Sequence, residues 1–170
     1  MLLAERAWAN KKAKPIRSNV SFLLDMASIL AEKKFVDKLE SCLKFMWKHF
    51  PDVKLKQVMQ DEHIHSSITK NKALYPVLKY EKSHNILENF VRVTNHSLYS
   101  VTKVFVKVSY RKKGNLETVQ ESLIKPLITA GGIATWPNVF NDAGWLGGNI
   151  QSVQVNVSCD EQRYFNSNSS

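Results

Sequence analysis

Residues 19–62 repeat apolar side chains every three or four positions, which is the spacing of one face of an α-helix. This spacing predicts helices over about 19–34 and 36–50, and a shorter third helix that reaches about residue 62. Residues 1–14 are expected to form a short helix, and Pro76 excludes a regular helix across the stretch that follows. The apolar positions of the first long helix are Phe22, Leu23, Met26, Ile29 and Leu30.

From Ile86 onward the pattern changes to an alternation of apolar and polar residues, which is typical of half-buried β-strands. The clearest strand runs over 101–110 and leads into a turn that contains Gly114. A partner strand over 116–124 is expected to end before Pro126. Further strands are predicted over 133–139 and 153–159, separated by a glycine-rich loop over 141–149.

These patterns predict an α+β protein, with an N-terminal helical segment of two to three helices followed by an antiparallel immunoglobulin-like β-sandwich. The alternative is a single sheet covered by the helices. We expect a basic helical segment over 1–84, a β-sandwich over 85–162 and a polar tail over 163–170. The interior of the sandwich is predicted to include Val104, Val106, Val108, Val153, Val155 and Val157.

A short series of motifs resembles a known family. Val93-Thr94-Asn95-His96-Ser97 is followed by the alternating run Val104–Tyr110 and then by Gly114. Over about residues 87–159, this series resembles the FxLYD-type modules of bacterial envelope proteins, which are immunoglobulin-like domains with an Asn-x-Ser turn after the first strand. The resemblance implies a binding or spacer module, and it implies no catalytic residues.

The positive charge lies mainly in the first half of the chain. Residues 1–84 hold 16 Lys and Arg against 9 Asp and Glu, and residues 85–170 hold 8 against 6. This bias is compatible with a protein partner of acidic character, and nucleic-acid binding by the helical segment is the alternative from another class. No apolar run is long enough to span a membrane. A cytoplasmic location is slightly favoured by the absence of a visible signal peptide, and a cell-envelope location would follow if a leader had been removed.

Candidate catalytic and metal-binding groups are few. His63 and His65 are two residues apart, but on a helix their rings would diverge by about 200°. Cys42 and His49 would lie about 10 Å apart on a helix, too far for a thiol and its base. We therefore expect a non-enzymatic protein-interaction or structural module with no catalytic residue, no metal and no cofactor.

The candidate binding surface is the glycine-rich loop over 141–149 with the two tryptophans that flank its start. Glycines allow a partner to approach the backbone, and aromatic side chains contribute much of the energy of typical interfaces. The alternative interpretation is that both tryptophans are structural residues that fill one end of the sandwich. The predicted binding residues are Trp136, Asn141, Asp142, Trp145 and Asn149.

Overall fold

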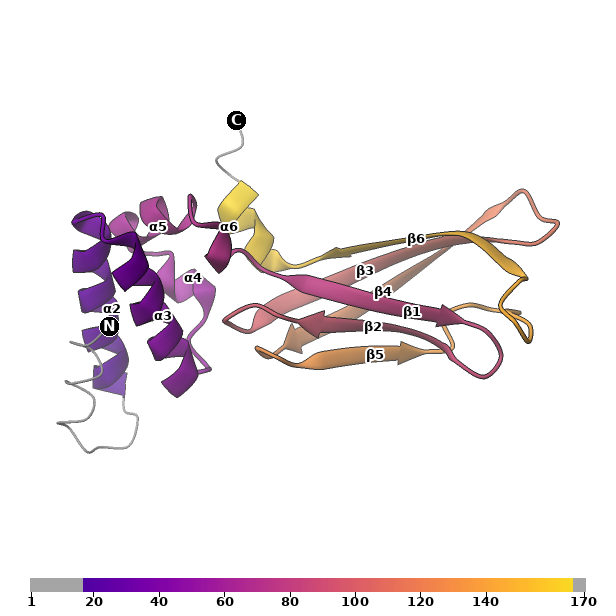
Figure 1. Ribbon diagram of the computed structural model, residues 1–170, viewed down its shortest axis with the longest axis horizontal. Coiled ribbons are helices and arrows are strands. Elements are labelled where there is room, and N and C mark those ends of the chain that lie inside the picture. The colour runs from indigo at the N-terminus through magenta and orange to yellow at the C-terminus, as the bar shows by residue number, and fades with distance from the viewer. Residues whose placement is uncertain (1–16, 167–170) are drawn as a thin grey trace. The chain divides into compact units, whose positions relative to one another are not determined.

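The computed structural model describes residues 17–166, which divide into two units that we treat separately (Figure 1). The first unit contains the described chain up to Tyr75, together with 98–100 and the residues from Arg163. The second unit contains 76–97 and 101–162. The helix expected over 1–14 lies outside the described residues. The predicted α+β order, helices first and antiparallel strands second, is confirmed.

The first unit is built from short helices. They are α2 (Arg17–Glu32), α3 (Val36–His49), α4 (Leu55–Val58), α5 (Glu62–Ile68), a 3-10 turn η1 (Lys72–Leu74) and α6 (Arg163–Asn166). Helix α2 packs against α3 and α5, and the buried side chains between them include Leu23, Ala27, Leu39, Leu43 and Ile68. The third predicted helix, which reaches about residue 62, is only the single turn α4, and α5, which begins at Glu62, was not predicted from the sequence.

The turn between α2 and α3 is set by Lys34, whose φ of 61° is left-handed. The Lys34 amide donates to the Ala31 carbonyl at 3.0 Å, and the Phe35 amide donates to the Leu30 carbonyl at 3.0 Å. This pattern closes the end of α2 in the manner of a left-handed C-terminal cap. Two separate helices follow, rather than the single continuous one that the apolar repeat would also have allowed.

An aromatic cluster completes the first unit. The buried Trp47 indole donates to the Val53 carbonyl at 2.9 Å, and its ring lies 4.9 Å from that of Tyr99. The Tyr99 hydroxyl in turn donates to the Leu74 carbonyl. Phe165 of α6 is buried, with its ring 4.4 Å from Tyr75. Residues 163–166, which the sequence suggests to be a polar tail, thus form a helical turn with a buried aromatic anchor.

The second unit holds two antiparallel sheets of three strands each, in the orders β1-β2-β5 and β4-β3-β6. The strands are β1 (Leu78–His84), β2 (Asn89–Asn95), β3 (Val101–Lys112), β4 (Thr118–Ile128), β5 (Ile133–Pro137) and β6 (Ile150–Ser158). Strands β2 and β3 are the central strands. The edges of the two sheets lie close to each other, β1 beside β6 and β4 beside β5.

The predicted alternation of β3 is observed. Val104, Val106 and Val108 are buried, whereas Lys103 and Lys107 are exposed. On β6 the three valines are half-buried and alternate with exposed neighbours, because β6 is an edge strand. Val106 pairs with Leu123 on one side and with Val157 on the other, so the apolar residues of the three strands share one face.

Several strand boundaries differ from the prediction, and three of the differences are informative. Strand β1 lies within residues 1–84, where a helical segment was expected, and the structure places it in the second unit. Strand β4 continues through Pro126 to Ile128 rather than ending before it. Because β4 pairs only with β3, an edge position accommodates a residue that has no amide hydrogen. Strand β5 ends at Pro137 instead of 139.

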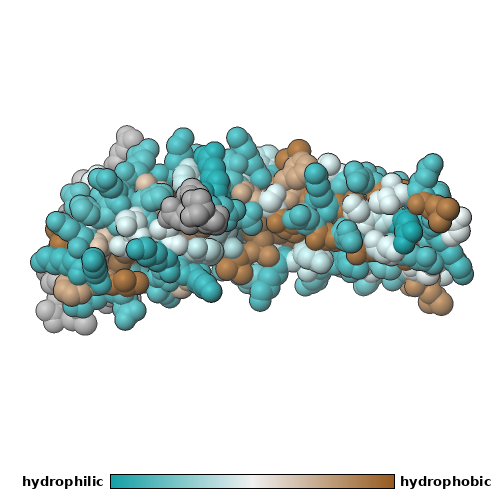
Figure 2. All heavy atoms as spheres, turned by 90° about the horizontal axis from the view of Figure 1, so that it is seen from above, coloured by the Kyte–Doolittle hydropathy of each residue, from teal (hydrophilic) through white to brown (hydrophobic). Residues whose placement is uncertain are grey.

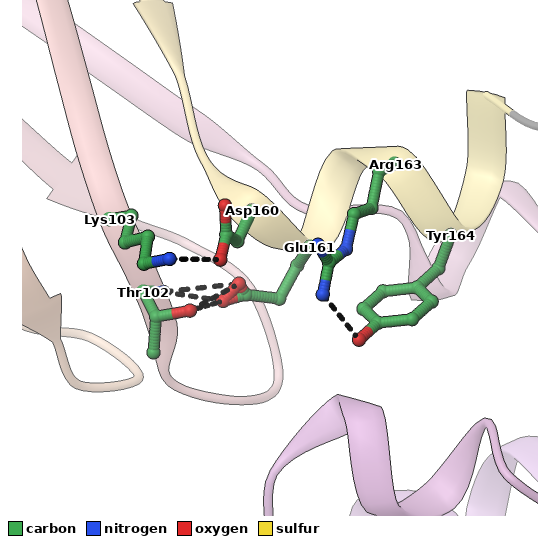
Figure 3. Close-up of polar contacts among 6 residues, drawn as sticks. All are labelled: Thr102, Lys103, Asp160, Glu161, Arg163 and Tyr164. Atoms are coloured by element: carbon green, nitrogen blue, oxygen red, sulfur yellow. Dashed lines mark hydrogen bonds and ion pairs between the residues drawn. The ribbon is translucent and has the colours of Figure 1, made fainter.

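The last strand of the second unit is fastened to the start of β3 by a buried carboxylate (Figure 3). Glu161, 5% exposed, accepts hydrogen bonds from the amide and the hydroxyl of Thr102. Next to it, the Lys103 ammonium lies 3.7 Å from the Asp160 carboxylate. Burial raises the pKa of Glu161 above its ordinary value, although the hydrogen bonds from Thr102 act in the opposite direction.

Candidate functional site

The candidate site is one end of the second unit, where three connections between strands meet. We define the Trp145 end as connections 85–88, 113–117 and 138–149. These join β1 to β2, β3 to β4 and β5 to β6 respectively. The Ile86 amide donates to the Gly144 carbonyl at 2.8 Å, and the Lys113 amide donates to the Asn149 carbonyl at 2.7 Å. The long 138–149 connection is therefore tied to both of the shorter ones.

Glycine is required at position 147 of this connection. Gly147 has a φ of +72°, and a Cβ atom there would lie 2.7 Å from the His84 carbonyl oxygen. The close approach also brings the Gly147 carbonyl to 3.2 Å from Nδ1 of His84. A side chain would both strain the backbone and push the connection away from β1.

The base of the 138–149 connection is buried and hydrogen-bonded. The Asn89 side chain accepts from the Phe140 amide at 2.9 Å and donates to the Phe140 carbonyl, which fixes that residue in both directions. The Phe140 ring meets those of Tyr110 at 5.2 Å and His84 at 5.5 Å, both edge-on. The Asn141 amide then donates to the Tyr110 hydroxyl at 3.2 Å. The exposed part of the connection thus extends from a rigid support.

The structure places the two predicted tryptophans in different surroundings. Trp145 is 71% exposed, on the outer part of the connection between the buried residues Ala143 and Gly147. Trp136 lies on β5, paired with Val91, and is half-buried. The two indoles of the predicted binding surface therefore differ in their access to solvent, and Trp145 is the more exposed of the two.

The three polar residues of the prediction lie beside Trp145 and are exposed. Asp142 forms an ion pair with the Lys112 ammonium at 2.9 Å, and this contact raises the pKa of Lys112. The Asn149 side chain donates to the Asp142 carbonyl at 3.4 Å. Asn141 contributes its backbone amide to the support described above. Asp142 and Asn149 thus hold the connection in shape as well as offering polar atoms at its rim.

Sequence reasoning missed a group of apolar side chains at the same end. Leu146 is 95% exposed, and the neighbouring connections add Ile86, Leu87 and Leu116, all of them exposed. Brown side chains protrude at the right-hand end of Figure 2, where Figure 1 places the loops of the second unit. Leu87 and Leu116 flank turn residues in the sequence, and an apolar residue inside a turn signal is the hint that could have identified them.

Charges of both signs surround these apolar residues. Lys112, Lys113, Glu88, Glu117 and Asp142 lie on these connections or next to them, and Lys112 pairs with Asp142. The Trp145 end therefore combines exposed apolar side chains with polar residues that have little net charge. This composition is the one found at protein–protein interfaces, where aromatic and apolar anchors are surrounded by polar residues.

The other candidate groups show no sign of reactivity. His63 and His65 lie on the short helix α5, and no group of three metal-ligating side chains occurs among residues 17–166. Burial raises the pKa of both thiols, Cys42 and Cys159, to about 11, so that both are protonated at neutral pH. The Cys42 thiol donates to the Leu23 carbonyl, and the His49 ring lies 4.4 Å from that of Phe45, tilted by 51°.

The chain matches no protein-family model, no curated protein and no solved structure. Within the described residues, no helix has the length and apolar character needed to cross a bilayer.

Proposed function

We propose that this protein is a non-enzymatic interaction module that binds another protein through the Trp145 end. The observation that carries the proposal is the exposure of Trp145 and Leu146 on a connection whose base is buried and hydrogen-bonded. Exposing a large indole and an isobutyl group to water is unfavourable, by roughly 25 cal/mol for each Å² of apolar surface. A partner that covers them would recover that free energy, and the rigid support reduces the entropy lost on binding.

A protein partner fits this end better than a membrane surface does. An anionic bilayer attracts a segment in proportion to its uncompensated Lys and Arg residues, about 1 kcal/mol for each. The two lysines of the Trp145 end are opposed by three carboxylates, so this attraction is small. A protein with an apolar pocket and a mixed polar rim can match both the side chains and the charges.

We also propose that the two sheets form an immunoglobulin-like sandwich, in keeping with the resemblance to FxLYD-type modules. Three features support it: each sheet buries one face, the sheet edges lie close together on both sides, and Asn95-His96-Ser97 forms a turn. In that turn the Ser97 amide donates to the Asn95 side chain at 2.9 Å. In such a fold the loops at one end commonly form the binding surface.

The test compares three forms of the full chain as bait for proteins from its source. The double variant Trp145→Ser with Leu146→Ser removes the exposed apolar side chains of the 138–149 connection. The control, Ile124→Ser with Leu127→Ser, removes two exposed apolar side chains from strand β4 instead. We expect a captured protein, once purified, to bind the wild type and the control with similar Kd, and the loop variant at least tenfold more weakly.

Equal Kd values for all three forms would contradict the proposal. Vesicles with and without an anionic lipid, and a DNA duplex at two salt concentrations, are tested in parallel. Vesicle binding that the loop variant loses would assign the Trp145 end to a membrane. DNA binding that weakens steeply with salt, with no protein partner, would favour the nucleic-acid alternative.

A further inference from the structure

A groove in the first unit has a chemistry unlike that of the Trp145 end. It is a pocket of about 430 Å³ between α5 and the turn that joins α2 to α3. One wall carries His63, Ser66, Ser67 and Lys70, which follow one another at the three-and-four spacing of a helical face. The opposite wall carries Lys34 in the turn and Glu32 at the end of α2.

The hydrogen-bond acceptors at the bottom of the groove already have donors. The Ala31 carbonyl accepts from the Lys34 amide at 3.0 Å and from the Ser67 hydroxyl at 3.4 Å. The Asn71 side chain accepts from the Ala73 amide at 3.1 Å and donates to Glu40 at 3.3 Å. Among the lining side chains, the exposed carboxylate of Glu32 is the acceptor that remains available to a molecule in the groove.

The donors of the groove, in contrast, are available. Neither Lys34 nor Lys70 forms an ion pair with a carboxylate of residues 17–166, and both side chains are exposed. Ser66 and His63 are exposed on the same wall and can donate from a hydroxyl and a ring nitrogen. A surplus of donors with positive charge favours a ligand that is rich in acceptors and negatively charged.

Acidic groups near the groove reduce this preference only in part. Glu32 is the one carboxylate among the described lining residues, against two lysines. The nearby Glu40 is neutralised by Lys44, whose ammonium lies 2.7 Å from it. Residues 17–75 of this unit hold ten Lys and Arg against seven Asp and Glu, and this modest surplus of positive charge also attracts anions.

We infer that this groove binds the phosphate group of a small phosphate ester, with Lys34, Lys70 and Ser66 as its donors. Lysine is a common point-charge partner of phosphate, and a hydroxyl adds a directed hydrogen bond. The volume lies within the range of about 300–1,000 Å³ that is usual for small-molecule sites, and so leaves room for an organic group beside the phosphate.

The experiment is a titration of the full chain with glycerol 3-phosphate, inorganic phosphate and sulfate, followed by backbone amide NMR shifts. We expect saturable shifts confined to residues 31–36 and 63–71, with the lowest Kd for glycerol 3-phosphate. The variant Lys34→Asn with Lys70→Gln should raise that Kd at least tenfold, and Glu32→Gln should lower it. Asn is chosen at position 34 because it tolerates the left-handed backbone.

The matched control, Lys48→Gln with Lys54→Gln, removes the same charge from the first unit outside the groove and should change the Kd less than twofold. If the control raises the Kd as much as the groove variant does, the proposed site is wrong, because attraction by the overall positive charge of the unit would then explain the binding. Equal Kd values for glycerol 3-phosphate and inorganic phosphate would overturn the assignment to an ester. If the double variant loses its folded NMR spectrum, Lys70→Gln alone serves, since its exposed side chain can be changed without disturbing the core.

Discussion

The two ends of the second unit differ in which side chains they bury and which they expose. At the Asn95 end, formed by residues 76–77, 95–97, 129–132 and 159–162, the polar side chain of Asn95 is fully buried. It donates to the carbonyls of Ile128 and Thr129 at 3.0 and 3.2 Å, and accepts from the Ser97 amide. At the Trp145 end, large apolar residues are highly exposed, among them Trp145 and Leu146.

Both ends nevertheless use asparagine to fix their connections. At the Trp145 end, the Asn85 side chain accepts from the Leu87 and Glu88 amides at 3.0 and 2.7 Å, and these bonds are exposed to water. The same turn chemistry therefore occurs in two environments. The comparison indicates that hydrogen bonding fixes the shape of both ends, whereas burial decides which end is structural and which is available to a partner.

The largest expected effect comes from replacing Asn95 with Ala. Two carbonyls and one amide would lose their partner, and a buried polar group without a partner costs about 1–3 kcal/mol. We expect the free energy of unfolding in urea to fall by about 3–5 kcal/mol. Asn85→Ala is the matched control and should cost about 1 kcal/mol or less, because water can replace its exposed bonds. Equal losses would show that burial does not distinguish the two ends.

The second prediction uses the carboxylate of the Asn95 end. Because the pKa of Glu161 is raised in the folded state, the folded protein binds a proton more tightly there than the unfolded chain does. Its contribution to stability is therefore complete below its ordinary pKa of 4.5 and is lost as the pH rises through the folded value. Within that window, wild type should lose stability relative to Glu161→Gln, by at most about 1.4 kcal/mol per pH unit.

Urea titrations at several pH values above 4.5 measure this difference. Asp142→Asn, at the Trp145 end, is the matched control for the loss of one carboxylate from the same unit, because its side chain is 82% exposed. A constant difference between wild type and Glu161→Gln across the range would be inconsistent with a raised pKa.

A smaller effect is expected at Ser152, near the start of β6. Its φ of 55° is left-handed, and it lies where the β3–β6 pairing contains a register shift between Ser109 and Arg111. A left-handed backbone costs about 1 kcal/mol for most residues but not for glycine. Ser152→Gly should raise the free energy of unfolding by about 0.5 kcal/mol, after the loss of the exposed hydrogen bond from Arg111. If thermal unfolding shows that Ser152→Gly is less stable than wild type, the backbone at Ser152 is not strained.

The smallest effect on stability is expected at the proposed binding surface itself. Trp145→Ala and Leu146→Ala should each change the free energy of unfolding by less than about 0.5 kcal/mol, because neither side chain packs in the core. A loss above 2 kcal/mol for either variant, on the order of a core truncation, would mean that the side chain has a structural role. The same samples can then be used in the binding test.

Local alternation was sufficient to predict the centre of the second unit. Val104, Val106 and Val108 follow a period of two, and a strand buried on one face must display that period. Strand β1 gave no such signal, because most of its residues are exposed, including Tyr80 and Glu81. Strand β1 forms because it pairs with β2, and a short stretch of sequence does not contain that pairing.

From the sequence, only the position of the loop that carries the candidate site could be predicted, and not which of its side chains are exposed. Gly144 and Gly147 marked a connection correctly, because both have a left-handed φ. The different exposure of Trp136 and Trp145 could not be predicted, since it depends on the register that pairs Trp136 with Val91. The cluster with Leu87 and Leu116 depends on three connections meeting at one end, which only the sheet topology determines.

Pro126 has a further consequence for the behaviour of this protein at high concentration. The segment from Leu123 to Ile128 is rich in β-forming apolar residues, with Ile124 and Leu127 exposed, and it lies on a strand that pairs on one side only. Such segments are templates for the intermolecular pairing that leads to amyloid. Pro126 removes an amide donor from the middle of the segment, and Lys125 adds a charge beside it. We therefore expect both residues to disfavour the pairing of β4 with a strand of another molecule.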